Sequence, residues 1–166
     1  MESIDILTMD YQQYLTATEI AAIEHEASIM ETLKVVQEHR GWVSDESLFA
    51  ISDLLAVPVA QLEGVATFYN LIYRQPVGQH VIHLCDSIAC HLTGLDAVLS
   101  AIKQYLNIDY GQTTKDGKFT LLSNACLGSC DKAPAMMIGT VHYQHLTPES
   151  AVELLQQLAL KGELDD

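Results

Sequence analysis

The sequence predicts an α+β protein in which an N-terminal helical bundle, residues 1–76, precedes a C-terminal α/β domain, residues 77–166. Apolar residues recur every three or four positions in the first part, which is the spacing of amphipathic helices. Strand-like and helix-like patterns alternate in the second part, which also holds all four cysteines. Pro76 and Gly78 interrupt both patterns between Arg74 and Gln79, so we place the domain boundary there.

Three helices are predicted in the first part. The first is capped by Thr18 and ends at Gly41, and the second begins at Ser44 and ends before Pro58. The third takes Pro58 into its first turn and runs to about Tyr69. The residues expected to face the interior are Ile20, Ile23, Ala27, Met30, Leu33, Leu62, Val65, Phe68 and Tyr69. Two interpretations stay open for Trp42, Phe68 and Tyr69: core residues, which is the commoner role, or anchors for a partner.

The second part combines predicted strands and helices. We expect, in order, a strand at 80–86, a helix at 93–106 capped by Thr93, a strand at 118–126, a hairpin of strands at 135–138 and 141–146, and a last helix opened by Thr147-Pro148-Glu149. The turn Lys115-Asp116-Gly117 leads into the second strand. Both cysteine pairs then lie at strand ends.

Composition narrows the classes of partner. The chain carries 8 basic and 22 acidic residues, a formal net charge of −14, which argues against nucleic-acid and membrane-surface partners. No apolar run approaches the roughly 20 residues of a membrane-spanning helix. The acidic start, MESIDILTMDYQQ, lacks the basic and apolar regions of a secretory signal. We therefore expect a cytoplasmic protein, whose thiols stay reduced and serve metal or redox chemistry.

The four cysteines form two close pairs, Cys85 with Cys90 and Cys126 with Cys130. Each pair leaves a predicted strand and enters a short loop, so one sheet could bring both loops to the same edge. Four thiolates there could hold two sulfide-bridged irons, with each pair on one iron. Gly128 lies inside the second loop, where its lack of a Cβ permits a left-handed bend that turns backbone N–H groups toward sulfur.

Spacing alone leaves three kinds of site open. A zinc site also takes four cysteines, although structural zinc usually has at least one C-x2-C pair and this chain has none. Disulfides, or unrelated buried thiols, are the third possibility. His91 follows Cys90 directly, but four cysteines already fill the ligand positions, so we interpret His91 as a loop residue. The absence of C-x-x-C argues against catalysis of the thioredoxin type.

Three stretches resemble one known family in order and spacing. They are RGWVSDESLFAISDLLAVPVAQLEGVATFY (40–69), PVGQHVIHLCDSIACHLTG (76–94) and FTLLSNACLGSCDKAPAMMI (119–138). The family is the 24-kDa-type [2Fe–2S] subunit of respiratory complex I, which in bacteria is the E subunit of NADH–quinone oxidoreductase. The resemblance covers roughly residues 18–160.

The resemblance implies a thioredoxin-like C-terminal domain that carries one [2Fe–2S] cluster. The ligands that it implies are Cys85, Cys90, Cys126 and Cys130. The chain would then be an electron-transfer subunit of an enzyme assembly that oxidises NADH, and not an enzyme by itself. Its sequence has no G-x-G-x-x-G and no P-loop, in keeping with FMN and NADH on a partner.

The partners that the resemblance implies are the flavin- and NADH-binding (F-type) subunit and the large iron–sulfur (G-type) subunit. Both would lie with this chain in the peripheral arm of a membrane-bound complex, on the cytoplasmic side and without direct membrane insertion. The equivalent subunit of an NAD-linked hydrogenase or formate dehydrogenase shares these motifs and is one alternative. A zinc-stabilised interaction module is the alternative from another class.

Overall fold

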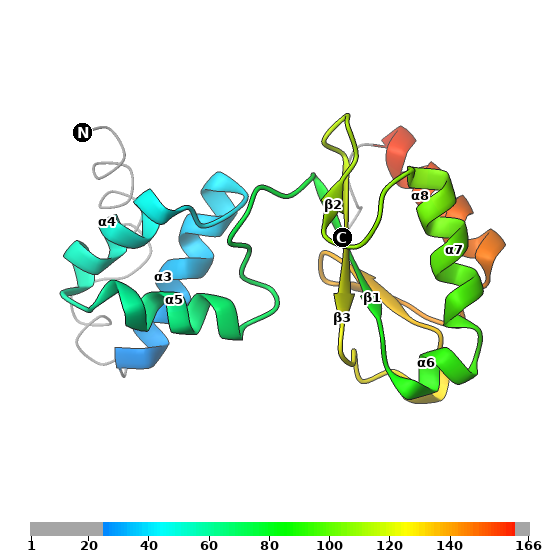
Figure 1. Cartoon of the computed structure of the whole chain (residues 1–166), viewed down its shortest axis with the longest axis horizontal. Helices are drawn as coiled ribbons and strands as arrows, with labels where there is room; N and C mark the ends of the chain where they lie inside the picture. Colours follow the sequence, from blue (N-terminus) through cyan, green and yellow to red (C-terminus); the bar gives the residue numbers. More distant parts are fainter. Residues whose placement is uncertain (1–24, 162–166) are drawn as a thin grey trace. The chain divides into compact units, whose positions relative to one another are not determined.

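The computed structural model of the chain describes the backbone of residues 25–161 and the side chains of residues 29–160. These residues fall into two compact units, one helical and one built on a sheet, and the chain passes from the first to the second between Pro76 and Val77 (Figure 1). The predicted α+β class is confirmed. No helix among the described residues is both long enough and apolar enough to cross a bilayer.

The helical unit contains α3 (His25–Arg40), α4 (Asp45–Leu55) and α5 (Val59–Phe68). Gly41 ends α3 as predicted, with a left-handed φ of 79° and its N–H bonded to the Gln37 carbonyl at 2.7 Å. Ser44 caps α4 as predicted, because its hydroxyl accepts from the Ser47 N–H at 3.2 Å. The α4 helix ends at Leu55, with Ala56 as its C-cap, before Pro58 is reached. The predicted cap Thr18 and the apolar Ile20 and Ile23 lie outside the described residues.

The core of the helical unit is formed by fully buried aliphatic side chains. They are Ile29, Leu33, Leu48, Ile51 and Leu62. The expectation that Phe68 and Tyr69 join them is wrong, because the two side chains are 76% and 49% exposed. Phe68 comes six positions after Leu62, about 240° around the helix, so it faces away from the core side. Ala66, one turn after Leu62, takes the inner position instead.

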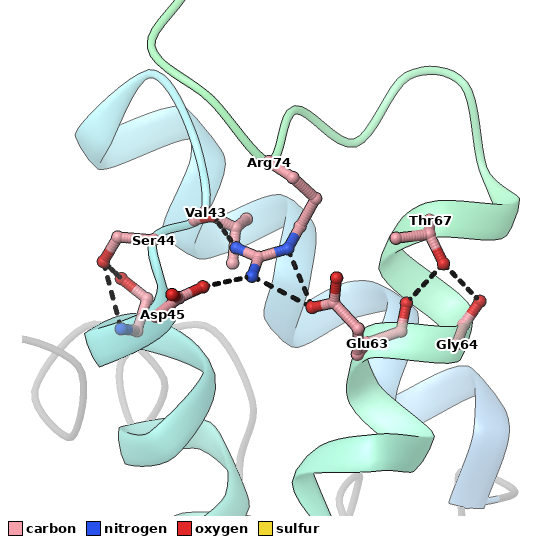
Figure 2. A network of polar contacts seen from close by, with 8 residues as sticks. Val43, Ser44, Asp45, Glu63, Gly64, Thr67 and Arg74 are labelled. Atoms are coloured by element: carbon pink, nitrogen blue, oxygen red, sulfur yellow. Dashed lines mark hydrogen bonds and ion pairs between the residues drawn. The ribbon is translucent and has the colours of Figure 1, made fainter.

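The chain leaves the helical unit through a segment that is bonded back onto it. The Val43 N–H donates to the Tyr73 carbonyl at 2.8 Å, and the Tyr73 N–H donates to the Gln37 amide oxygen at 2.6 Å. The Arg74 guanidinium then reaches three groups at once (Figure 2). It donates to the Val43 carbonyl, to Asp45 at the start of α4, and to Glu63 within α5.

The sheet unit is a mixed five-stranded sheet in the order β2-β3-β1-β4-β5. Its strands are β1 (His80–Cys85), β2 (Gln112–Thr113), β3 (Phe119–Asn124), β4 (Met136–Ile138) and β5 (Val141–Tyr143). The central strands β1 and β3 are parallel, and every other neighbouring pair is antiparallel. The helices α7 (Leu95–Leu106) and α8 (Pro148–Lys161) pack against each other on the same side of the sheet (Figure 1). The predicted hairpin at Gly139-Thr140 is confirmed as β4–β5.

Three short elements of this unit were not predicted, and one of them, the 3₁₀ turn η1 (Cys130–Lys132), lies in the second cysteine loop. Another is the helix α6 (Ile88–Leu92), whose C-terminal end is capped by the Thr93 hydroxyl donating to the Ala89 carbonyl at 2.8 Å. Thr93 therefore does not start α7, which begins after Gly94 in a left-handed conformation. The third is β2, because two residues are too few to produce an alternating pattern.

Candidate functional site

The four cysteines all lie at or just beyond the carboxyl ends of the two parallel strands. Cys85 is the last residue of β1 and pairs in register with Asn124, the last residue of β3, so Cys126 follows within two residues. Cys90 lies in α6, which follows directly on the end of β1 (Figure 1). Cys130 begins the 3₁₀ turn η1 (Cys130–Lys132), which contacts α6. Parallel strands that end at one edge therefore bring the two loops together, as the sequence predicts.

Within each pair the thiols are close. The Sγ atoms of Cys126 and Cys130 lie 3.7 Å apart, and the thiols of Cys85 and Cys90 are hydrogen-bonded to each other. All four cysteines are free, and 3.7 Å is far beyond the S–S bond length of about 2.05 Å, so the disulfide interpretation is not supported. Two thiolates on one tetrahedral metal, at metal–sulfur distances of about 2.3 Å, lie about 3.8 Å apart. The Cys126–Cys130 separation is close to that value.

Backbone N–H groups face the sulfur atoms from several segments. The N–H groups of Ser87 and Leu127 donate to Cys85, so the second cysteine loop contacts the first. The Ala135 N–H donates to Cys90, directly after the cis peptide bond between Ala133 and Pro134. The Gly128 N–H lies 3.4 Å from the sulfur of Cys126. Such donors are what a negatively charged, partly buried sulfur site needs.

The conformation of Gly128 confirms its predicted role. Its φ of 79° is left-handed, a region that other residues adopt only with strain. An added Cβ would meet no atom within 4 Å, so the requirement for glycine comes from the backbone angle and not from crowding. The bend places the Gly128 N–H over Cys126.

The pKa values of the cysteines differ because their burial, hydrogen-bond donors and neighbouring thiols differ. Burial alone would raise the pKa of Cys85, but hydrogen bonds with the Ser87 hydroxyl, the Leu127 N–H and the Cys90 thiol hold it below its usual value. Burial and the neighbouring Cys85 raise the pKa of Cys90. The adjacent Cys126 raises the pKa of Cys130, with smaller contributions from the charges of Cys85 and Cys90. The four thiols thus affect one another, and a second thiolate in either pair needs a neutralising cation.

The two pairs differ in exposure. Cys85 and Cys90 are 2% and 1% exposed and belong to the core that lies between the sheet and the helices. Cys126 and Cys130 are exposed at the surface. One side of the site is therefore enclosed by protein, and the other is open to a partner.

His91 lies in α6, so its interpretation as a loop residue is wrong. Its Nε2 contacts a carboxylate oxygen of Asp86 at 2.6 Å, and its Nδ1 contacts Asp96 at 3.3 Å. The hydrogen bond to Asp86 and the charges of both carboxylates raise the pKa of His91. Because both ring nitrogens are engaged, the structure favours a bridging role over ligation, in agreement with four cysteine ligands.

The donor set fits two metal positions better than one. The thiols form two neighbouring pairs, and backbone N–H groups surround them. A mononuclear zinc site requires four ligands around one point, whereas a bridged two-iron site takes two thiolates at each iron.

Sequence reasoning found the cysteines and Gly128 but missed the donors around them. Ser87 carried a usable signal, since a serine two residues after a strand-end cysteine can turn its hydroxyl back onto sulfur. Leu127 and Ala135 carried none, because their contribution is a backbone N–H that every residue except proline possesses.

Comparison with known sequences gives strong matches over nearly the whole chain. The sequence profile of the thioredoxin-like [2Fe-2S] ferredoxin family matches residues 12–159. The E subunit of NADH-quinone oxidoreductase from Salmonella typhimurium is 52% identical over 151 residues, which cover 86% of this chain and 91% of that protein. The corresponding E subunit from Pseudomonas aeruginosa is 47% identical over 150 residues, which cover 86% of this chain and 90% of that protein.

Comparison with solved structures concerns the fold. A chain in the crystal structure of an NAD+-reducing [NiFe]-hydrogenase in the H2-reduced state matches with a TM-score of 0.67 and 23% identity. The match covers 78% of this chain but only 22% of the hydrogenase chain, so this chain spans about a fifth of that length. A second structure of such a hydrogenase, in the air-oxidised state, gives a TM-score of 0.65. At this identity the similarity shows a shared fold alone.

Proposed function

This chain belongs to the thioredoxin-like [2Fe–2S] ferredoxins, within the family of the E subunit of NADH–quinone oxidoreductase, and we propose that its four cysteines are the ligands of one [2Fe–2S] cluster. Membership of the family implies the cluster and a role as an electron-transfer subunit of complex I. The ligand assignment rests on one observation, the meeting of two cysteine pairs beyond the ends of β1 and β3.

When bound, the cluster supplies a place to hold one electron at a time. The protein's own residues hold the four sulfurs in two pairs and direct N–H groups at them. The donors from Ser87, Leu127 and Ala135 serve the enclosed pair, and the Gly128 N–H serves the exposed pair. Because hydrogen bonds to sulfur favour added negative charge, these donors offset part of the repulsion from a chain of charge −14.

The proposed partner for electron exchange is the flavin- and NADH-binding subunit, which would carry FMN and NADH, and the large iron–sulfur subunit is the proposed second neighbour. Relatives named as subunits of NADH-quinone oxidoreductase support the assembly, although not these particular contacts. The proposed location is the peripheral arm on the cytoplasmic side of the membrane.

The helical unit is proposed to dock onto the flavin-binding subunit. Phe68 and Leu71 are 76% and 50% exposed at the end of α5 and just beyond it, an unusual position for large apolar side chains. Phe68 also lines a cavity of about 280 Å³, together with Met30 of α3 and with Gly64 and Tyr69 at α5. A partner that inserts an apolar side chain there would hold the cluster-bearing unit near its flavin.

An equivalent subunit of an NAD-linked hydrogenase is the nearest alternative function. Identity separates the two, because the relatives from NADH-quinone oxidoreductase share 47–52% of their residues with this chain and the hydrogenase chain shares 23%. We therefore propose complex I as the assembly. The zinc-module alternative is disfavoured by the paired arrangement of the thiols.

The test of the cluster is purification of the full chain without oxygen. A red-brown protein with about two irons and two labile sulfides per chain is expected. Reduction with dithionite should give the electron paramagnetic resonance signal of a reduced [2Fe–2S] cluster. A colourless protein with one zinc per chain would overturn the proposal.

A further inference from the structure

The helix α6 carries an exposed apolar pair directly outside the cysteine site. Ile88 and Leu92 are its first and last residues, four positions apart and therefore on the same face. Their side chains are 79% and 83% exposed. Cys90 lies between them in sequence, on the opposite face, and is buried. The pair thus covers no part of this protein's core, although it lies on the same short helix as Cys90, a proposed ligand.

The surroundings of this pair are acidic. Asp86 precedes α6, Asp96 lies in the first turn of α7, and Asp131 lies in η1, which contacts α6. One cation, Lys132, stands beside Asp131 in η1. His91, which lies in α6 with the apolar pair, contacts Asp86 and Asp96 and so ties both carboxylates to this helix. The face therefore presents an apolar centre with a net negative rim.

From this arrangement we infer that Ile88 and Leu92 form the contact through which the cysteine site docks onto its electron-transfer partner. The partner that fits is a protein with an apolar recess edged by Lys or Arg side chains. The inference rests on the proposed function, because it takes that partner to be the flavin-binding subunit. It adds a second contact, distinct from the one proposed for the helical unit.

The charge of the rim decides among possible occupants. A second copy of this chain would bring another acidic rim and another net charge of −14, so the two faces would repel. An anionic lipid surface is repelled for the same reason. A basic partner is attracted, and complementary rims steer it into register over a small apolar centre. Electron transfer slows steeply with distance, so the contact belongs on the elements that hold the sulfurs.

The experiment compares variants of the full-length chain in binding to the purified flavin- and NADH-binding subunit of the same assembly. In the double variant Ile88→Ser/Leu92→Ser, the dissociation constant should rise on the order of 100-fold, as expected when two aliphatic side chains are lost from the centre of an interface. The conservative variant Ile88→Val/Leu92→Ile should bind within about threefold of the wild type. The matched control is Leu160→Ser, which alters an 88% exposed leucine on α8 and should leave binding unchanged.

Iron content and the electron paramagnetic resonance spectrum of each variant are measured in parallel. Both should be unchanged, because the two side chains point away from the sulfurs. Wild-type affinity in the double variant overturns the inference. A wild-type protein without a [2Fe–2S] spectrum would instead overturn the proposed function, so the two failures are distinguishable.

A second measurement does not depend on the serine variants assembling correctly. A photo-reactive p-benzoylphenylalanine replaces Leu92 in the intact assembly, and the same residue replaces Leu160 in the control. Illumination should link position 92 to the flavin-binding subunit and leave position 160 unlinked to it. Linkage of position 92 to another copy of this chain, to a different subunit or to none overturns the inference.

Discussion

Replacing Arg74 should destabilise the helical unit more than replacing any exposed cation. The Arg74 side chain is only 17% exposed, and its guanidinium joins the start of α4, the middle of α5 and the Val43 carbonyl (Figure 2). Arg74→Met keeps most of the aliphatic stem and removes these donors. The change therefore reports on the polar network rather than on lost packing.

The size of the effect follows from the exposure of each partner. Asp45 is 82% exposed, so its contact at 2.6 Å contributes at most about 1 kcal/mol. Glu63 is 44% exposed and takes two donors at 2.9 and 3.0 Å, which adds about 1 kcal/mol. The carbonyl of the buried Val43 loses a charged donor, at a cost of about 1–2 kcal/mol. The free energy of unfolding should fall by about 2–4 kcal/mol.

The assay uses the single tryptophan of the chain. Trp42 lies next to Val43 in the helical unit, so its fluorescence during urea titration follows that unit. For a denaturant slope of about 1 kcal/mol/M, the midpoint of Arg74→Met should fall by about 2–4 M. Arg74→Lys should lose part of this amount, because an ammonium cannot reproduce the planar fork.

The control is Lys34→Met, which removes an exposed ion pair to Glu31 at 3.1 Å and should change the midpoint by less than about 0.5 M. Equal midpoints for Arg74→Met and Lys34→Met would refute the energetic role of the network. A parallel shift in the visible absorption of the cluster would show that the two units unfold together, contrary to their division at Pro76 and Val77.

Four further outcomes are expected. Cys90→Ser should lose or strongly destabilise the cluster, and a normal spectrum with full iron content would show that Cys90 is not a ligand. Gly128→Val should reduce cluster occupancy or shift the reduction potential, since a branched residue at φ 79° costs about 1–2 kcal/mol, whereas Gly64→Ala in α5 should do neither. Burial, and to a smaller extent the Lys118 charge, lowers the pKa of His80 in the folded state, so the free energy of unfolding should fall as the pH drops below the unfolded pKa of about 6.5. His80→Gln should flatten this pH dependence when unfolding by urea is measured at several pH values. An unchanged dependence of the unfolding free energy on pH would contradict this role of His80. A fragment that starts at Val77 should assemble a cluster but keep only the α6 contact, so it should bind the flavin-binding subunit more weakly than the full chain; equal affinity of fragment and full chain would contradict docking through the helical unit.

Features that depend on neighbouring residues could be predicted from the sequence. Ser44 and Thr147 cap the helices that they were predicted to cap, because each hydroxyl reaches a backbone N–H only three residues away. Gly41 and Gly128 adopt the left-handed angles that their positions suggested. The paired cysteines followed from strand ends, since parallel strands share an edge.

Features that depend on the packed structure could not be predicted in the same way. Thr93 is a good cap for either of two helices, and only the presence of α6 shows that it serves the end of one rather than the start of the next. The pattern around Phe68 allowed more than one inward face, and packing of Leu62 and Ala66 selected the one that exposes the aromatic ring. The N–H donors of Leu127 and Ala135 depend on where the backbone runs.

A redox site places two opposing demands on a protein, and the cysteine pairs divide them. The first demand is enclosure by protein, which fixes the sulfurs and brings N–H donors to them. Cys85 and Cys90 are enclosed in this way. The second demand is access for a partner, which requires exposed ligands. Cys126 and Cys130 are exposed and meet this demand. The acidic surface adds a third element, because repulsion between copies allows Ile88 and Leu92 to stay exposed without driving self-association. The same charge disfavours an added electron, so the donors aimed at sulfur limit how far the potential is depressed.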